Sequence, residues 1–235
     1  MTAGVADRLR GELVTATRLL VHVGVLDYSG HLSARIPGTD HVLIQPRDRS
    51  RAALTPEDLV TVDLDGNLVE GVAPPPAETA LHTGVYRARP DVQFTCHGHP
   101  SLSTTFTMID QPVLPMRHFA YRFAQGLPVH PDPTHIRSRE QGDAVAATLG
   151  AAGGCFLRAH GTVVVGDRID VLFMDCLDIE ENARTQLLAN QLGGKLLPLT
   201  ETEVAQIDAS YAGLGHRPAK MWEHFVHKAQ LSGML

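Results

Sequence analysis

Two histidines stand one residue apart in the stretch TCHGHP, residues 95–100, at the end of an apolar run. Side chains two residues apart share one face of a β-strand, so His97 and His99 would present two imidazoles side by side. Neutral imidazoles are common ligands of divalent transition metals. The pair indicates half of a metal site, although two partly exposed strand-end histidines would show the same spacing.

Two further residues would complete such a site. His160 stands at the tip of a hairpin predicted from residues 155–159 and 162–165, from which it could reach a neighbouring strand end. Glu78 lies in the first turn of a helix predicted to precede the HxH strand. Taken singly, a solvated turn histidine and a carboxylate stabilising a helix dipole are sufficient explanations. Together, three imidazoles and one carboxylate match a site for one divalent ion per subunit. We expect zinc, with manganese, iron or cobalt as alternatives.

Periodicity and turn signals place these residues on alternating helices and short strands. Strand and hairpin signals cover residues 31–38, 41–46, 59–71, 91–99 and 155–165. Helix signals cover residues 5–25, 73–90, 138–150 and 168–191, with further helices beginning near 200 and 218. Capping boxes match two helix starts, Ser138 with Gln141 and Thr200 with Glu203. We predict one α/β domain over residues 1–235 with a largely antiparallel sheet, and a functional loop at 107–137.

The composition sets limits on partners and compartment. The 235 residues suffice for one well-buried core, and the formal charge of −6 disfavours a nucleic-acid backbone as partner. No apolar run of about 18 residues is present, so we expect no membrane span. The three cysteines are far apart and form no CxxC motif, which favours a reduced, cytoplasmic protein without disulfides.

Four segments carry a resemblance to a known family. They are GHLSAR (30–35), LTPEDLVTVDLDGNLVEG (54–71), AETALHTGVYRARPDVQFTCHGHP (77–100) and RAHGTVVVGDRIDVLFMDCLDIEENAR (158–184). In order and spacing they resemble the class II aldolase/adducin family. The resemblance implies an α/β fold with a central antiparallel sheet flanked by helices, and a homotetramer with active sites at subunit interfaces. It also implies that His97, His99 and His160 are metal ligands and that Glu78 is the acid/base carboxylate and sometimes a fourth ligand.

A divalent ion in this site would suit the cleavage of a carbon–carbon bond. As a Lewis acid, it would accept the electron density left next to an oxygenated carbon, in an aldolase or in a hydroxyaryl-carboxylate decarboxylase. Glu78 would then transfer the proton. Tyr121, in the loop 107–137, is a candidate acid for a neighbouring subunit's site, with a packed interface aromatic as the alternative. The C-terminal segment 210–228 is a candidate to close over the site.

The residues expected to bind phosphate differ from those of the family's sugar-phosphate enzymes. Those enzymes use a Gly-Asn turn, a Ser/Thr-Gly pair and a Ser-Ser pair. Here His31 stands in place of the asparagine, Arg47-Asp48 in place of the second pair and Pro76-Ala77 in place of the third. Because proline has no N–H and alanine no side-chain donor, the phosphate cradle is expected to be absent.

The replacement residues suit a planar carboxylate instead. Guanidinium groups are well shaped for carboxylates, so Arg47 and Arg49, with His31 and Ser33, are the predicted substrate contacts. Solvated loop arginines are the alternative. We therefore predict decarboxylation of a nonphosphorylated hydroxyaryl carboxylate, of the dihydroxyphthalate or dihydroxybenzoate type, in aromatic catabolism. Other possibilities are an aldolase or epimerase for a sugar phosphate or free hydroxy-keto acid, an adducin-type binding module, and an iron oxygenase.

Overall fold

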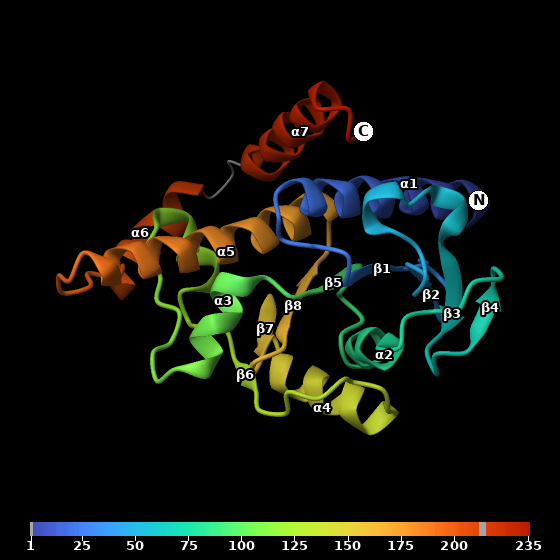
Figure 1. Ribbon diagram of the computed structural model, residues 1–235, viewed down its shortest axis with the longest axis horizontal. Helices are drawn as coiled ribbons and strands as arrows, with labels where there is room; N and C mark the ends of the chain where they lie inside the picture. The colour runs from blue at the N-terminus through green and yellow to red at the C-terminus, as the bar shows by residue number, and fades with distance from the viewer. Residues whose placement is uncertain (1, 212–214) are drawn as a thin grey trace.

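The computed structural model describes residues 2–211 and 215–235, which form an α/β structure around an eight-stranded sheet (Figure 1). The strand order is β4-β3-β2-β1-β5-β8-β7-β6. The strands are β1 His31–Arg35, β2 His41–Ile44, β3 Val60–Asp63, β4 Leu68–Glu70, β5 Phe94–Gly98, β6 Val129–His130, β7 Gly154–Leu157 and β8 Gly161–Gly166. Only β6 and β7 pair in parallel among the described residues, so the predicted antiparallel sheet is confirmed.

Helices cover both faces of the sheet. They are α1 Thr2–His22, α2 Thr79–Ala88, α3 Ser101–Thr105, α4 Arg139–Leu149, α5 Ile169–Gln191, α6 Glu201–Tyr211 and α7 His216–Leu231. In Figure 1, α1 and α5 lie above the sheet, and α2 and α4 lie below it. Because successive strand residues point to opposite faces, Val164 packs in the core with α1 and α5, whereas Val163 and Val165 pack with α2 and α4. None of the helices in the described ranges has the length and apolar content needed to cross a membrane.

Several predicted boundaries shift at the elements that carry site residues, and the helix predicted over 73–90 begins only at Thr79, after the prolines. Both capping boxes form, and Gly150 ends α4 as expected. The strand predicted over 91–99 begins at Phe94 and ends at Gly98, which leaves His99 one residue beyond it. Glu78 is the N-cap residue of α2, not a member of its first turn. Its side chain makes no capping hydrogen bond and is free to point elsewhere.

Helices α2 and α4 touch through their main chains. A Cβ added to Gly142 of α4 would lie 2.1 Å from the carbonyl oxygen of Ala80, and one added to Gly84 of α2 would lie 2.5 Å from the main chain at Gly142. Both helices therefore require glycine where they meet. Since Glu78 begins α2, this contact helps to fix the position of its carboxylate.

Replacing Gly142 by alanine is expected to destabilise the fold by about 1–3 kcal/mol, because the new methyl group forces the helices apart. Gly11 of α1 is the matched control: a Cβ there would have no atom within 4 Å, and its alanine variant should gain roughly 0.5–1 kcal/mol from helix propensity. Urea unfolding of the three proteins measures both changes. Equal stability of the two variants would contradict the proposed main-chain contact.

Candidate metal centre

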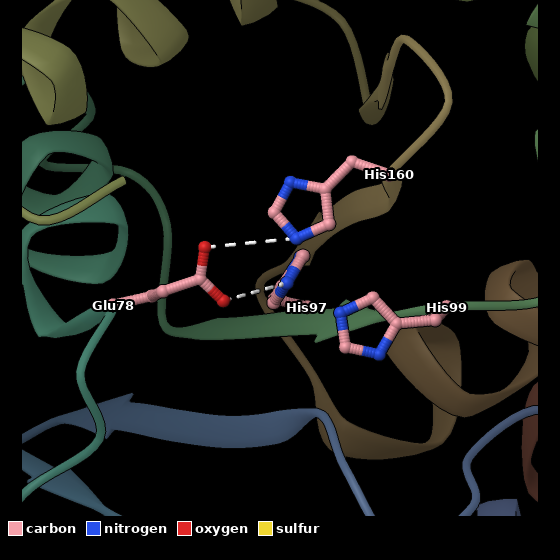
Figure 2. Close-up of side chains that lie close together, drawn as sticks. All are labelled: Glu78, His97, His99 and His160. Carbon is pink, nitrogen blue, oxygen red and sulfur yellow. Dashed lines mark ion pairs between the residues drawn. The ribbon is translucent and has the colours of Figure 1, made fainter. Parts of the chain in front are cut away.

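Four side chains from separate parts of the chain converge beside the middle of the sheet (Figure 2). Glu78 comes from the start of α2, His97 from β5, His99 from the residue after β5 ends, and His160 from the turn between β7 and β8. One ligand atom from each lies within 4.8 Å of those from the other three. The strand end and the hairpin tip therefore meet, as expected of a histidine at the tip of that hairpin.

Glycines allow β5 and β8, the strands next to these histidines, to approach each other closely. A Cβ on Gly161 would lie 2.1 Å from the carbonyl oxygen of Gly98 and 3.1 Å from a ring carbon of His99. At the hairpin tip, Ala159 adopts a left-handed conformation with φ of 54°, which costs a non-glycine residue about 1–2 kcal/mol. This turn brings the ring of the next residue, His160, to 5.0 Å from that of His97, measured between ring centroids.

Hydrogen bonding fixes which nitrogen His97 offers to the site. Its Nδ1 lies 2.9 Å from the carbonyl oxygen of Thr162, which can only accept, so Nδ1 carries the hydrogen. In neutral His97, the lone pair of Nε2 then faces a Glu78 oxygen at 3.3 Å. His97 Nε2 is buried without a hydrogen-bond partner, and His160 Nε2 faces the other Glu78 oxygen at 3.6 Å. A single proton would satisfy one of these facing pairs, whereas a divalent ion would satisfy all of them, so the donor set fits a metal.

The electrostatics favour the protonation states that metal ligands need. Burial and the neighbouring histidines lower the pKa of His99 to about 4, and burial also lowers the pKa of His160. Burial opposes ionisation of Glu78, whereas the His97 ring, when it carries a proton on Nε2, and the Ile136 N–H lower the pKa of this carboxyl group to about 2. At neutral pH, His99 and His160 are therefore neutral and the carboxylate is ionised.

The predicted loop 107–137 contributes to this centre through its last residues. The main-chain N–H of Ile136 donates a hydrogen bond to Glu78 Oε1 at 3.0 Å. The adjacent His135 is exposed, and its ring lies 5.7 Å from that of His160, measured between ring centroids. The aperiodic sequence contains no signal for the Ile136 contact, because a main-chain donor leaves no mark on residue type.

The residues predicted to contact substrate separate into three groups. His31 lies at the centre, with its Nε2 3.9 Å from a Glu78 oxygen. Ser33 is fully buried, and its hydroxyl is hydrogen-bonded within the protein, so this geometry gives it no open side for a substrate. Arg47 and Arg49 are exposed and pair with Asp48 at 3.1 Å and Asp58 at 2.9 Å. Within the described ranges, neither arginine forms a hydrogen bond or an ion pair with the four clustered residues.

Two buried residues that sequence reasoning missed support this region. Arg51 donates hydrogen bonds to the carbonyl groups of Gly30 and Pro46, and so holds the loops on either side of β1 and β2. His82 of α2 is fully buried and bonded to His31 at 2.7 Å. Its spacing of four residues from Tyr86 was the available signal, since it places both side chains on one helix face.

Tyr121 and the C-terminal segment lie away from this chain's cluster. The Tyr121 ring stacks on that of Tyr211 at 5.2 Å between centroids, where the short helix His118–Phe123 meets α6. Helix α7 packs against α5 and α1, and Arg217 forms a bidentate ion pair with Asp178 of α5. The segment 210–228 therefore does not close over the cluster of its own chain, and its residues 212–214 lie outside the described residues.

Comparisons with known proteins bear on the family and the fold. Residues 11–187 match the family model described as Class II Aldolase and Adducin N-terminal domain. The chain is 28% identical to a 3,4-dihydroxyphthalate decarboxylase of Arthrobacter keyseri, over 84% of this chain and 85% of that protein. It is also 28% identical to a 5-methylthioribulose-1-phosphate/5-deoxyribulose-1-phosphate aldolase of Rhodospirillum rubrum, over 83% and 88%. The fold matches that of L-fuculose 1-phosphate aldolase from Glaciozyma antarctica PI12 with a TM-score of 0.84, at 23% identity over 99% and 93%.

Metal binding can be tested without an activity assay. The wild-type protein is expected to bind about one zinc ion per chain, and zinc at 100 times its dissociation constant should stabilise it by about 2.7 kcal/mol relative to protein in chelator. His97→Gln should lose most of this gain. His130→Gln is the control, because His130 is also buried but bonds to Thr148 outside the cluster. Elemental analysis and thermal unfolding measure both effects, and equal zinc binding by the two variants would refute the assignment.

Proposed function

Because the chain belongs to the class II aldolase and adducin family, we propose that it is a divalent-metal-dependent lyase that decarboxylates a nonphosphorylated hydroxyaryl carboxylate of the dihydroxyphthalate or dihydroxybenzoate type. The observation that carries the lyase proposal is the convergence of the Glu78 carboxylate with three imidazoles. The preference for a carboxylate substrate is supported by the decarboxylase relative and by the changed phosphate-binding positions, where Pro76 has no N–H to offer.

The proposed reaction needs one proton to be moved, and Glu78 is suited to move it. His97, His99 and His160, with Glu78 as a fourth ligand, would hold the ion, which when bound supplies Lewis-acid stabilisation to the substrate oxygens. The ionised carboxylate accepts the proton of a substrate hydroxyl. When the bond to the carboxyl carbon breaks and carbon dioxide leaves, Glu78 returns that proton to the ring carbon. The substrate oxygen regains a proton from solvent on release.

The proposal also covers the residues that recognise the substrate and the assembly of the subunits. We assign the second carboxylate of the substrate to Arg47 and Arg49, whose exposed side chains can leave Asp48 and Asp58. We also propose a homotetramer with sites at subunit interfaces, where Tyr121 of the partner subunit acts as an acid. This assembly would give a function to a tyrosine that lies away from its own cluster.

An aldolase or epimerase is the second candidate function. The sugar-phosphate aldolase relative is as similar in sequence as the decarboxylase relative, at 28% identity over a comparable share of the chain. A free hydroxy-keto acid would also meet the constraint of missing phosphate contacts. The two functions share the metal and the proton transfer, and they differ in the bond that breaks.

The decisive experiment measures products. Zinc- and manganese-loaded protein is expected to release carbon dioxide from 3,4-dihydroxyphthalate or a dihydroxybenzoate, with no aldehyde formed from sugar phosphates in a coupled assay. Turnover of phosphorylated sugars alone would overturn the decarboxylase proposal and favour the aldolase.

Glu78→Gln is expected to lower kcat by about 10²- to 10⁴-fold, because the amide cannot accept the substrate proton, while most of the zinc remains bound by the histidines. Glu180→Gln provides the contrast. Glu180 is equally buried but accepts the main-chain N–H groups of Leu102 and Ser103, so its variant should lose stability and keep its turnover. Kinetics and zinc analysis of both variants check this. Full activity of Glu78→Gln would exclude the carboxylate as the proton carrier.

A further inference from the structure

A continuous chain of hydrogen bonds runs from the interior of the protein to the candidate metal centre. The Tyr86 hydroxyl lies 2.9 Å from Ser33 Oγ, which lies 2.6 Å from His82 Nδ1. His82 Nε2 lies 2.7 Å from His31 Nδ1, and His31 Nε2 faces Glu78. Three of the four side chains are at most 1% exposed and His31 is 6% exposed, so the chain is shielded from water up to its last ring.

The hydrogens in this chain are all bonded only if they point the same way. Ser33 could accept from both Tyr86 and His82, but its own buried hydrogen would then have no acceptor, so the donor at one link sets the donor at the next. In one direction Tyr86 donates to Ser33, Ser33 to His82 and His82 to His31, which leaves the last hydrogen on His31 Nε2. In the other direction His31 carries its hydrogen on Nδ1 and presents a lone pair to the centre.

The buried end of the chain selects the first direction. Burial raises the pKa of Tyr86 to about 12, so its hydroxyl keeps a hydrogen that needs an acceptor. Ser33 Oγ lies 2.9 Å from this hydroxyl, and Thr95 also interacts with it. If Ser33 donated to Tyr86, the buried Tyr86 hydrogen would have to turn to the Thr95 hydroxyl, which lacks the geometry of a hydrogen bond, and this is costly.

The end at the metal centre selects the same direction. His31 Nε2 lies 3.9 Å from an oxygen of the Glu78 carboxylate. A hydrogen on Nε2 is attracted to this negative group, whereas a lone pair would be repelled by it. Burial, with a contribution from His97, lowers the pKa of His82 to about 3, so the middle ring is neutral and can both accept and donate.

We propose that Tyr86, Ser33 and His82 are positioning residues that hold His31 as an N–H donor aimed at the substrate, where it binds a carboxylate oxygen beside the metal. The donor role rests on the proposed function, whereas the direction of the hydrogen bonds does not. His31 would thus be a neutral donor that cannot serve as a further metal ligand. This neutral N–H donor favours substrates with an anionic oxygen at that position, and it adds no charge to the buried site.

The direction can be read by nuclear magnetic resonance of the metal-free and zinc-loaded protein labelled with ¹⁵N in the histidine rings. Nitrogen shifts distinguish the ring nitrogen that carries hydrogen from the one that does not. We expect hydrogen on Nε2 of both His31 and His82, with resonances assigned from the His31→Asn and His82→Gln variants. Hydrogen on Nδ1 of His31 would overturn the proposal whatever reaction the protein catalyses.

Substitutions test whether the buried residues act through His31. Ser33→Ala breaks the chain and should give mixed His31 tautomers and about tenfold weaker binding of phthalate, used as a probe of the zinc-loaded protein in calorimetry. Ser103→Ala is the matched control, since Ser103 is equally buried but its hydroxyl has no hydrogen-bond partner. It should leave the tautomers and the phthalate affinity unchanged.

A double-mutant comparison separates positioning from general damage. Asparagine at position 31 carries its own N–H donor, whose direction does not depend on His82. Adding Ser33→Ala to His31→Asn should therefore cause no further loss of phthalate affinity, with thermal unfolding used to confirm that each variant is folded. An equal loss in both backgrounds would show that Ser33 acts by a route other than His31 and would overturn the proposal.

Discussion

The centre of this protein is built on a repulsion that only positive charge can relieve. The Glu78 carboxylate faces the Nε2 lone pair of neutral His97 at 3.3 Å and Nε2 of His160 at 3.6 Å, in a largely buried space. The main chain enforces this arrangement, because the carbonyl of Thr162 fixes His97 and the N–H of Ile136 holds Glu78. Neither group can turn away without losing a buried hydrogen bond. The fold therefore holds acceptors together in the geometry that a divalent ion requires.

The two faces of the sheet differ in the residues that they bury. The face covered by α1, α5 and α7 buries leucine and phenylalanine side chains and supplies no residue to the metal cluster. The other face carries α2 and α4, which meet through Gly84 and Gly142, and α2 supplies Glu78, His82 and Tyr86. Polar groups on α2 are buried beside the sheet only because each is hydrogen-bonded or directed at the metal centre.

Most of the fold and the four clustered residues could be predicted from the sequence, and the supporting contacts could not. The HxH spacing, the hairpin around His160 and the capping box at Ser138 are local signals. Each depends on residues close together in the sequence, and each feature is present in the structure. By contrast, Ser33 was predicted to face substrate, but its hydroxyl is bonded to His82. The sequence does not indicate this contact, because the two residues become neighbours only after α2 has packed on the sheet. The Ile136 contact uses a main-chain N–H, and Arg51 bonds to carbonyl groups, so residue type carried little information about either.

The main-chain contact between α2 and α4 has a consequence for how this scaffold can change. Gly84 and Gly142 let the two helices meet through their main chains, so this contact does not depend on the exposed side chains of either helix. Exposed side chains of the surrounding loops, such as Arg47, Arg49 and His135, can then differ while the main chain that holds the carboxylate and the imidazoles stays in place. A change in substrate contacts would thereby leave the four clustered residues where they are.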